Sequence, residues 1–478
     1  MKSRRKRRIM KHRAGGRGGR GRSRRKTGGL KLLHPEKQGF DPVMDMIRSP
    51  GAGLSVLTTA SLKGFIIELN VRRENAEYTT FSGAAGSGSK MTTPVTSYIL
   101  KFAILTDSPT KLPAYDGDDK VSETPEDYYA ESKLQQSVWI ASITGGKTPA
   151  CPSVANFALF DNNNAQDVVD YLMTVSSGGV RYVFNYFYDI LSKYKLCNLG
   201  VITMPKLVDS YTLASIEETL KSKRENRRAD IACIAQIIRM FLDIGVLHFD
   251  LHAGNVMLYD SHRTPGDINC TIIDFGLASN IANGVDDGYF NVAEKNVINQ
   301  KRREYVEGYD QAETKGKKEK SDYIAHVFDF LINVDKLVYR IKQNNGKFTN
   351  GHQMDSFDYM VDASHAAERV LVFDKLKEYM TPNNLGKMLP TTVRKYSADG
   401  YFVDFNRPIS DFYVEFEFPS SVVQAHTFPT ISIPSPPASP AVASVALQPP
   451  ACTPEKSAKG MCTIMGGGSR RKRHRAYN

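Results

Sequence analysis

The sequence predicts an α+β fold with two lobes, a first lobe rich in β-strands (N-lobe) and a second made of helices (C-lobe). Apolar runs of strand length, bounded by turn residues, lie at 54–57, 65–69 and 97–105. Later in the chain, apolar residues recur at helical spacing from 231 to 242. Further helical periodicity lies at 323–337 and 360–379. A polar motif comes directly after the first helical segment, where a site between two lobes would lie.

The composition divides the 478 residues into a folded region and two tails. An Arg/Gly-rich segment at 1–30 cannot bury a core, and we expect it to be disordered. A Pro/Ser-rich linker and a basic cluster make up 417–478, and we expect disorder there too. Between the tails we predict an N-lobe with an insertion at 42–204 and a C-lobe at 205–416.

The positive charge of the chain lies in its tails. The net charge is +12, yet 14 Lys and Arg lie between Lys2 and Lys26 and five more between Arg470 and Arg475, so the remainder is mildly acidic. Clustered Lys and Arg bind phosphate backbones in a salt-dependent way, so nucleic acid is one candidate partner of the tails. The alternatives are nuclear import, and a solvated polycation that aids solubility or packing into a virion.

Cysteine usage and hydropathy indicate the compartment. The six cysteines are scattered and form no C-x-x-C pair, so the sequence predicts neither a structural zinc site nor an oxidising environment. No apolar segment follows the basic N-terminus as in a signal peptide, and no apolar run is long enough to span a bilayer. We therefore expect a soluble, intracellular protein without a membrane partner, with a nuclear or virion-associated location as the further options.

The motif at 248–255 reads His-Phe-Asp-Leu-His-Ala-Gly-Asn, and Asp-Phe-Gly follows at 274–276. Each lies beside an apolar stretch that we expect to be a strand, 256–259 and 271–273. In phosphoryl transfer an Asp orients the nucleophile, while an Asn five residues later and a second Asp bind the metal that bridges the ATP phosphates. A polar turn between two strands is the alternative, but such a turn does not require these identities in this order.

This order of residues resembles the protein-kinase superfamily and, more loosely, the divergent Ser/Thr protein kinases of large DNA viruses. The resemblance implies a bilobal protein-kinase-like fold and the use of ATP and Mg²⁺. It implies that Asp250 is the catalytic base or orienting residue, that His248 anchors the loop, and that Asn255 and Asp274 bind Mg²⁺. A carboxylate and an amide that converge on a cation make physical sense, because charge on the transferring phosphoryl group must be neutralised.

Lys101 lies in the middle of an apolar strand, where a charge needs a partner. By the same resemblance it is the lysine that binds the α- and β-phosphates of ATP; the alternative is a strand-edge lysine that points to water. Its partner should be a glutamate of the helix that begins after Thr124, an N-cap residue followed by proline. Glu131 is the first choice, with Glu123 and Glu126 as alternatives.

The sequence has no regular G-x-G-x-x-G to cover the phosphates. The turn at 58–64 offers hydroxyls and backbone N–H groups instead, and we predict that Ser61 and Gly64 bind ATP there; an ordinary hairpin turn is the alternative. Met204 ends a buried strand and resembles the residue beside the adenine pocket of kinases, with a hinge at 204–210. A core methionine is the alternative for this position.

The sequence departs from protein kinases at three points. Phe249 replaces a common arginine, so no arginine is there to bind a phosphorylated activation segment. His252, which we count with the catalytic residues, replaces the usual lysine near the γ-phosphate and can still donate a hydrogen bond. In this the loop resembles aminoglycoside-phosphotransferase-like and ABC1-like enzymes, which read H-x-D-x-H-x-x-N. No A-P-E follows the Asp-Phe-Gly, and the charged stretch 299–320 is expected to be an exposed insertion.

The function that these residues favour is an ATP- and Mg²⁺-dependent phosphotransferase acting on Ser/Thr hydroxyls of a protein substrate. One alternative keeps the chemistry and changes the acceptor to a small molecule, since His252 and the missing A-P-E both point away from protein kinases. The other is a pseudokinase scaffold that binds nucleic acid through its tails. The joint presence of Asp250, Asn255 and Asp274 argues against the scaffold.

Overall fold

A computed structural model of the chain describes most of the region between the tails. The residues described are 41–49, 51–59, 61–71, 78–79, 93–94, 97–143, 147–207, 210–215, 223–260, 268–281, 290–344, 353–380 and 403–416. All of them belong to the first of two units, Met1–Phe418; the second is Pro419–Asn478. The tails predicted at 1–30 and 417–478, and with them the predicted nucleic-acid contacts, lie outside the described residues.

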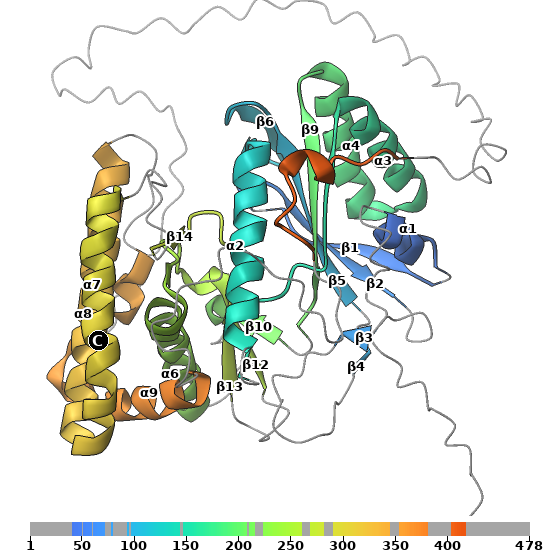
Figure 1. Cartoon of the computed structure of the whole chain (residues 1–478). Helices are drawn as coiled ribbons and strands as arrows, with labels where there is room; N and C mark the ends of the chain where they lie inside the picture. Colours follow the sequence, from blue (N-terminus) through green and yellow to red (C-terminus); the bar gives the residue numbers. More distant parts are fainter. Residues whose placement is uncertain are drawn as a thin grey trace, which may run out of the picture. The chain divides into compact units, whose positions relative to one another are not determined.

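The N-lobe is built on a five-stranded antiparallel sheet with the order β1-β2-β5-β9-β8 (Figure 1). Its strands are β1 (Gly53–Thr58), β2 (Phe65–Asn70), β5 (Ser97–Leu105), β8 (Asn156–Phe160) and β9 (Asn198–Pro205). Every strand that the sequence predicted in this lobe is confirmed. β5 is central and almost completely buried, because helices cover both faces of the sheet at this point.

Short elements surround this sheet. They are α1 (Asp41–Arg48), β3 (Tyr78–Thr79), β4 (Thr93–Pro94), β6 (Lys111–Tyr115) and β7 (Asp118–Val121). β6 and β7 form a hairpin whose two turn residues, Asp116 and Gly117, have φ angles of 50° and 86°. Positive φ at both positions defines the tight turn that matches the twist of paired strands, and Asp-Gly is its preferred sequence.

Helix α2 (Pro125–Ile143) covers one face of the sheet. It begins as predicted, with the Thr124 hydroxyl accepting a hydrogen bond from the Asp127 amide at 3.0 Å. The Tyr128 ring lies directly over Gly200 of β9, since a Cβ there would come within 2.5 Å of the ring. Gly200 therefore lets α2 approach the sheet closely.

Two further helices, α3 (Asn162–Val175) and α4 (Gly178–Lys193), cover the opposite face. They connect β8 to β9 and pack on each other. Phe184 and Phe187 of α4 contact the ring of Phe102, at centroid distances of 5.4 and 6.1 Å. This helical pair lies within the predicted N-lobe range, so that lobe is less purely β than the sequence suggested.

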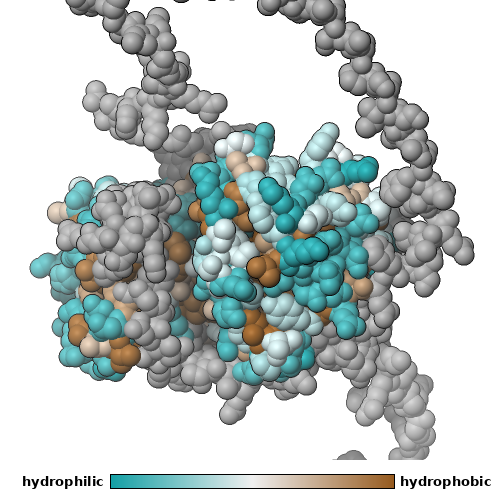
Figure 2. All heavy atoms as spheres, turned by 90° about the horizontal axis from the view of Figure 1, so that it is seen from above, coloured by the Kyte–Doolittle hydropathy of each residue, from teal (hydrophilic) through white to brown (hydrophobic). Residues whose placement is uncertain are grey.

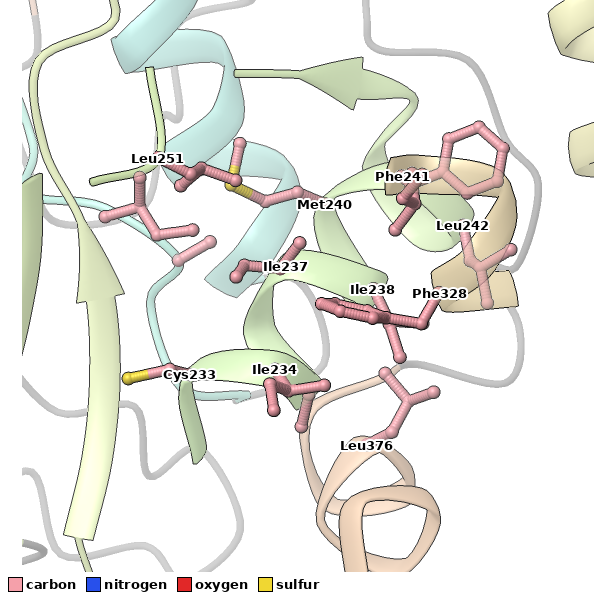
Figure 3. Close-up of a cluster of buried hydrophobic side chains, with 14 of the residues drawn as sticks. Cys233, Ile234, Ile237, Ile238, Met240, Phe241, Leu242, Leu251, Phe328 and Leu376 are labelled. Atoms are coloured by element: carbon pink, nitrogen blue, oxygen red, sulfur yellow. The ribbon is translucent and has the colours of Figure 1, made fainter. Parts of the chain in front are cut away.

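The C-lobe is mostly helical, as predicted. Its elements are β10 (Ser210–Thr212), η2 (Leu213–Ser215), α6 (Lys223–Arg239), the π-helical turn η3 (Met240–Ile244), β11 (Val246–Leu247), η4 (Ala253–Asn255), β12 (Val256–Asp260), β13 (Ile268–Ile272), β14 (Ser279–Asn280), α7 (Val292–Lys315), α8 (Lys317–Asn344), η5 (Gln353–Val361), η6 (Ala363–His365) and α9 (Ala366–Tyr379). Apolar side chains of α6, among them Ile234 and Ile238, pack with Phe328 of α8 and Leu376 of α9 (Figure 3). α6 is the centre of this core, and it runs directly into the polar motif.

The charged stretch 299–320 is not an exposed insertion, as the sequence analysis expected, but part of α7 and the start of α8. Tyr309 and Ala312 of α7 are buried in the C-lobe core. Arg302 is buried as well, and its guanidinium donates to the carbonyl oxygens of Leu242 (3.0 Å) and Asp243 (3.3 Å) in the π-helical turn. The sequence analysis took the charged residues of this stretch as exposed. A buried arginine such as Arg302 is possible here because carbonyl oxygens at a helix end accept its hydrogen bonds.

Arg239 ties α2 to the C-lobe. It is completely buried at the end of α6 and donates to the carbonyl oxygens of Ser142 and Thr148, both at 2.5 Å. Its guanidinium also lies 3.6 Å from the Asp243 carboxylate. Because Ser142 belongs to α2, this one side chain holds the C-terminal end of that helix.

The segment 403–416, here called the C-terminal strap, returns from the C-lobe range of the sequence to the N-lobe. The strap, which includes η8 (Ile409–Phe412), lies beside α2 in Figure 1. Phe405 and Phe412 pack on Tyr129 of α2, and the Val414 amide donates to Leu159 O of β8 at 2.9 Å. The predicted C-lobe range 205–416 thus ends in residues that pack on the other lobe.

None of the described helices is long and apolar enough to cross a membrane. Seen from above in Figure 2, the described surface is mostly hydrophilic and its apolar residues are scattered. Single exposed apolar side chains such as Leu196 are ordinary for a folded domain.

The strap makes a testable contribution to stability. The Tyr129 hydroxyl oxygen lies 2.8 Å from Phe405 O and 3.0 Å from Arg407 O. Tyr129→Phe removes this donor from two carbonyls and should lower the free energy of unfolding by about 2 kcal/mol, measured by urea denaturation. Tyr182→Phe, at a side chain that is 68% exposed, is the matched control. Equal stability of the two variants would contradict a structural role for the strap.

Candidate active site

The centre of the candidate site is a buried cluster of charges drawn from three parts of the fold. Lys101 of β5 places its Nζ 2.6 Å from Glu131 Oε1 of α2 and 3.4 Å from Asp274 Oδ1, just after β13. Of the three glutamates considered in the sequence, Glu131 is therefore the one that contacts Lys101. The Lys101 and Glu131 side chains are 7% and 3% exposed, whereas Asp274 is 43% exposed. Asp274 is the member of the cluster that remains open to a ligand.

Burial and mutual attraction both act on these groups. Burial works against the charge of Lys101, but Asp274 and Glu131 outweigh it and hold its pKa well above the usual value. Burial raises the pKa of Glu131 to about 7, against the opposing effect of Lys101. Lys101 lowers the pKa of Asp274. The lysine and Asp274 therefore stay ionised at neutral pH, as an electrostatic site for phosphate and cation requires.

His248 holds the polar motif against the strand that leads to Asp274. Its Nε2 lies 3.0 Å from Ile273 O, and its ring meets Phe275 edge-on at 5.1 Å. Burial lowers the pKa of His248 to about 4, so the ring is neutral and Nε2 carries the proton that it donates to the carbonyl. His248 is thus placed to position the loop.

Asp250 and Asn255 are held together within the loop. The Asn255 amide nitrogen donates to Asp250 O (2.9 Å) and to Asp250 Oδ2 (3.1 Å). The Ile273 amide donates to Asn255 O at 3.0 Å, which fixes the loop to the residue before Asp274. The Asn255 side chain thus holds Asp250, and one backbone bond holds Asn255 beside the segment that carries Asp274.

His252 is exposed at the start of η4, where its Nδ1 accepts a hydrogen bond from the Gly254 amide at 3.0 Å. An Nδ1 that accepts a bond carries no proton, so Nε2 is the ring nitrogen that can donate. Gly254 permits this arrangement, because a Cβ there would lie 2.9 Å from the imidazole. His252 can therefore offer a hydrogen bond to phosphate through Nε2.

Two residues of the motifs have strained backbones. Phe249 and Asp274 have φ angles of 59° and 63°, a region that residues with a Cβ rarely adopt. Phe249 is buried against Phe290, at a centroid distance of 5.7 Å, so packing holds it there. Such strain persists where the surroundings over-determine the conformation, typically at functional sites.

Met204 shares a sheet face with Lys101. Ile202 pairs with Lys101 across β9 and β5, and Met204 lies two residues further along β9. Its sulfur lies 3.1 Å from Gln135 Nε2 of α2. The residue is half-buried, between helix and strand, at the edge of the predicted adenine pocket.

The predicted phosphate turn is held more tightly than the sequence suggested. The nitrogen of Lys120, from β7, donates to Ser61 O at 2.6 Å and also to Thr59 O. Gly64 lies against β5, since a Cβ would come within 2.3 Å of Phe102 O. Close backbone approach thus accounts for this glycine, and ATP binding by Ser61 and Gly64 stays a prediction.

Sequence reasoning missed Lys63, a second lysine of the site. Its Nζ lies 2.7 Å from Glu123 Oε1. An added Cβ on Gly276 would lie 3.5 Å from Lys63 Nζ, 3.5 Å from Asp274 Oδ1 and 3.2 Å from Glu131 Oε2. The turn before β2 therefore reaches the Asp-Phe-Gly segment. Lys63 was missed because nothing in the sequence of a turn shows where a long side chain ends.

The donor set fits magnesium. Mg²⁺ is usually bound in enzymes by one or two carboxylates together with substrate phosphates and water. Asp274, with its partly exposed carboxylate, and the amide oxygen of Asn255 are suitable ligands of this kind. Within the described ranges, no group of three or more His, Cys, Asp or Glu residues could hold a metal by itself. Magnesium would therefore depend on the nucleotide for its remaining ligands.

A family model described as ABC1 atypical kinase-like domain matches residues 193–307. The match runs from the end of α4 through the polar motif and the Asp-Phe-Gly into α7, so it includes Asp250, Asn255 and Asp274 but neither Lys101 nor Glu131. This segment is similar to the ABC1 atypical kinase-like domain, which is part of the protein-kinase-like superfamily. No curated protein matches the chain significantly. The looser resemblance to viral Ser/Thr kinases stays a prediction.

The buried His248 predicts a pH dependence of stability. Its pKa is about 4 in the folded protein against 6.5 ordinarily, so between these values the unfolded chain takes up a proton that the folded protein excludes. The stabilisation is complete above pH 6.5 and is lost as the pH falls toward 4. From pH 7 to pH 5, wild type should lose about 2 kcal/mol more stability than His248→Gln.

Urea denaturation of both proteins at the two pH values measures this difference. His326→Gln, at an exposed histidine of α8, is the control and should retain the wild-type pH dependence. An unchanged pH dependence in His248→Gln would show that His248 is not a buried neutral ring.

Proposed function

We propose that this chain is a phosphotransferase that uses ATP and Mg²⁺. The observation that carries the proposal is the ion-paired cluster of Lys101, Glu131 and Asp274, which joins a central strand, a helix and the Asp-Phe-Gly segment. A buried ion pair often contributes no more to stability than well-packed apolar residues would, so stability alone does not account for this cluster. Ionisable groups with perturbed pKa values cluster at functional sites. The family match of the adjoining segment supports the same chemistry.

Each residue has a role in this proposal. Lys101 binds the α- and β-phosphates and Glu131 holds it in place. Asp250, fixed by Asn255, orients the acceptor hydroxyl and receives its proton. Asp274 and Asn255 bind Mg²⁺, which when present neutralises phosphate charge.

The acceptor has two candidates. Ser/Thr hydroxyls of proteins are the acceptor that the kinase resemblance implies. A small-molecule acceptor is the second, and two observations favour it: the match to an atypical kinase-like domain, and His252 as the hydrogen-bond donor in place of a lysine. Phe249 is packed on Phe290, so activation through a phosphorylated segment bound at this position is not expected in either case.

The metal-binding and proton-accepting carboxylates give the test of the chemistry. Asp274→Ala should abolish Mg²⁺-dependent transfer of the γ-phosphate, and Asp250→Asn should lower its rate by roughly 10²- to 10⁴-fold. Transfer is measured with γ-labelled ATP. Asp310→Ala, at an exposed residue of α7, is the control for removal of a carboxylate. A near-normal rate in Asp274→Ala or Asp250→Asn would place the chemistry elsewhere.

A panel of acceptors separates the two candidates. Generic basic proteins, the enzyme itself, and sugars, choline and aminoglycosides are offered with labelled ATP. Label on protein, absent in Asp274→Ala, establishes a protein kinase. Label only on a small molecule establishes the second candidate, and no turnover with any acceptor or with water would leave the pseudokinase scaffold as the better account.

A further inference from the structure

Lys63 lies at the place where nucleotide phosphates would meet the N-lobe. It belongs to the turn between β1 and β2, and this turn covers the phosphates in kinases. Its Nζ, Asp274 Oδ1 and Glu131 Oε2 all lie within 3.5 Å of one point beside Gly276. The turn therefore reaches the Asp-Phe-Gly segment through a side chain.

The turn presents Lys63 from a fixed backbone. Lys120, which is 2% exposed, donates to the carbonyls of Thr59 and Ser61 on the N-terminal side of Lys63. The Val121 amide donates to Leu62 O at 3.0 Å. On the C-terminal side, Gly64 packs against β5. These contacts hold the backbone on both sides of Lys63, so the turn presents this side chain from a fixed position.

Charge also favours Lys63 as a ligand of phosphate. Lys101 is shared between Glu131 and Asp274 and its side chain is 7% exposed, whereas the Lys63 side chain is 35% exposed. His252 supplies a hydrogen-bond donor in place of the usual lysine. Lys63 is thus the more accessible of the two lysines in the cluster, at a site that must accept a polyanion.

The partner of Lys63 is suited to release it. Glu123 is 3% exposed, and its Oε2 is one of the buried carboxylate oxygens that accept no hydrogen bond from the described residues, as is Glu131 Oε2. Together with Asp274 these glutamates place three carboxylates against two lysines, so the cluster as it stands carries more negative than positive charge. Arrival of a metal cation would weaken the hold of the carboxylates on Lys63.

We propose that Lys63 is a second phosphate-binding lysine, which leaves Glu123 to bind the terminal phosphates of the nucleotide. It takes the place of the glycine-rich backbone that the turn lacks and supplies a positive charge beside the Asp-Phe-Gly segment. This inference rests on the proposed use of ATP. It goes beyond that function by assigning the recognition of the terminal phosphates to one side chain of the N-lobe.

The alternative is that Lys63 and Glu123 form a purely structural ion pair, and two substitutions with opposite expected effects distinguish the two. Lys63→Met should weaken binding of fluorescent mant-ATP with Mg²⁺ by about 10- to 100-fold and leave mant-AMP binding unchanged. Glu123→Gln should tighten mant-ATP binding, because it removes the competitor for Lys63. Lys63→Arg should restore part of the affinity, since it keeps the charge.

All variants are made in the full-length chain. Lys111→Met, at a lysine that is 71% exposed and paired with Asp119, should bind as wild type does. Equal loss of mant-ATP binding and of thermal stability in Lys63→Met and Glu123→Gln would overturn the proposal in favour of the structural pair. Wild-type affinity in Lys63→Met would overturn it as well.

The same measurement separates this proposal from the proposed function. If the wild type binds mant-ATP through Lys63 but transfers no phosphate, the inference stands and the proposed function is wrong. If the wild type transfers phosphate and Lys63→Met binds mant-ATP as the wild type does, only the inference is wrong. If the wild type binds no nucleotide, both are wrong.

Discussion

The buried ammonium group of Lys101 is the constraint on which the arrangement of the site depends. Removing a charge from water costs several kcal/mol unless opposite charges within ion-pair distance replace the lost hydration. Glu131 and Asp274 provide them, at 2.6 and 3.4 Å. Because these three residues come from β5, α2 and the end of β13, satisfying one lysine fixes the sheet, the helix and the Asp-Phe-Gly segment with respect to one another.

The position of α2 follows from this constraint, and the fold holds the helix at both ends. Arg239 binds its last turn through Ser142 O, and the strap packs on Tyr129 near its first turn. Such a helix has little freedom to withdraw Glu131 from Lys101. With Phe249 in place of an arginine, the described loop has no arginine at this position to bind a phosphorylated segment. The ion pair is therefore a feature of the fold itself, maintained by contacts far from the reacting groups.

Much of this arrangement could be predicted from the sequence, because local patterns determine it. Four of the five strands of the main N-lobe sheet, the N-cap at Thr124 and the preference for Glu131 as the partner of Lys101 were predicted from periodicity, residue chemistry and the kinase resemblance. The Asp116–Gly117 hairpin also had a local signal, the Asp-Gly pair, which the sequence analysis did not use. Helices α3 and α4 lie in a part of the N-lobe for which the sequence analysis predicted no helices.

Other features depend on contacts that no local pattern encodes. The burial of Arg302 depends on carbonyls of the π-helical turn some sixty positions earlier in the chain, so its charge was read as exposure. The strap packs on Tyr129 across a separation of 276 residues. Lys63 could be assigned to a turn but not to a partner, since the end of a lysine side chain is placed by the tertiary structure.

The balance of charge in the site connects these residues to a ligand. Lys63 and Lys101 face Glu123, Glu131 and Asp274, and two buried carboxylate oxygens of the glutamates accept no hydrogen bond from the described part of the chain. Unpaired buried acceptors destabilise a folded protein, so an arrangement of this kind is better suited to a bound state than to the protein alone. A divalent cation at Asp274 would turn the excess of negative charge into an excess of positive charge, and phosphate would then be the group that restores neutrality. Cation and polyanion would thus each create the conditions under which the other binds.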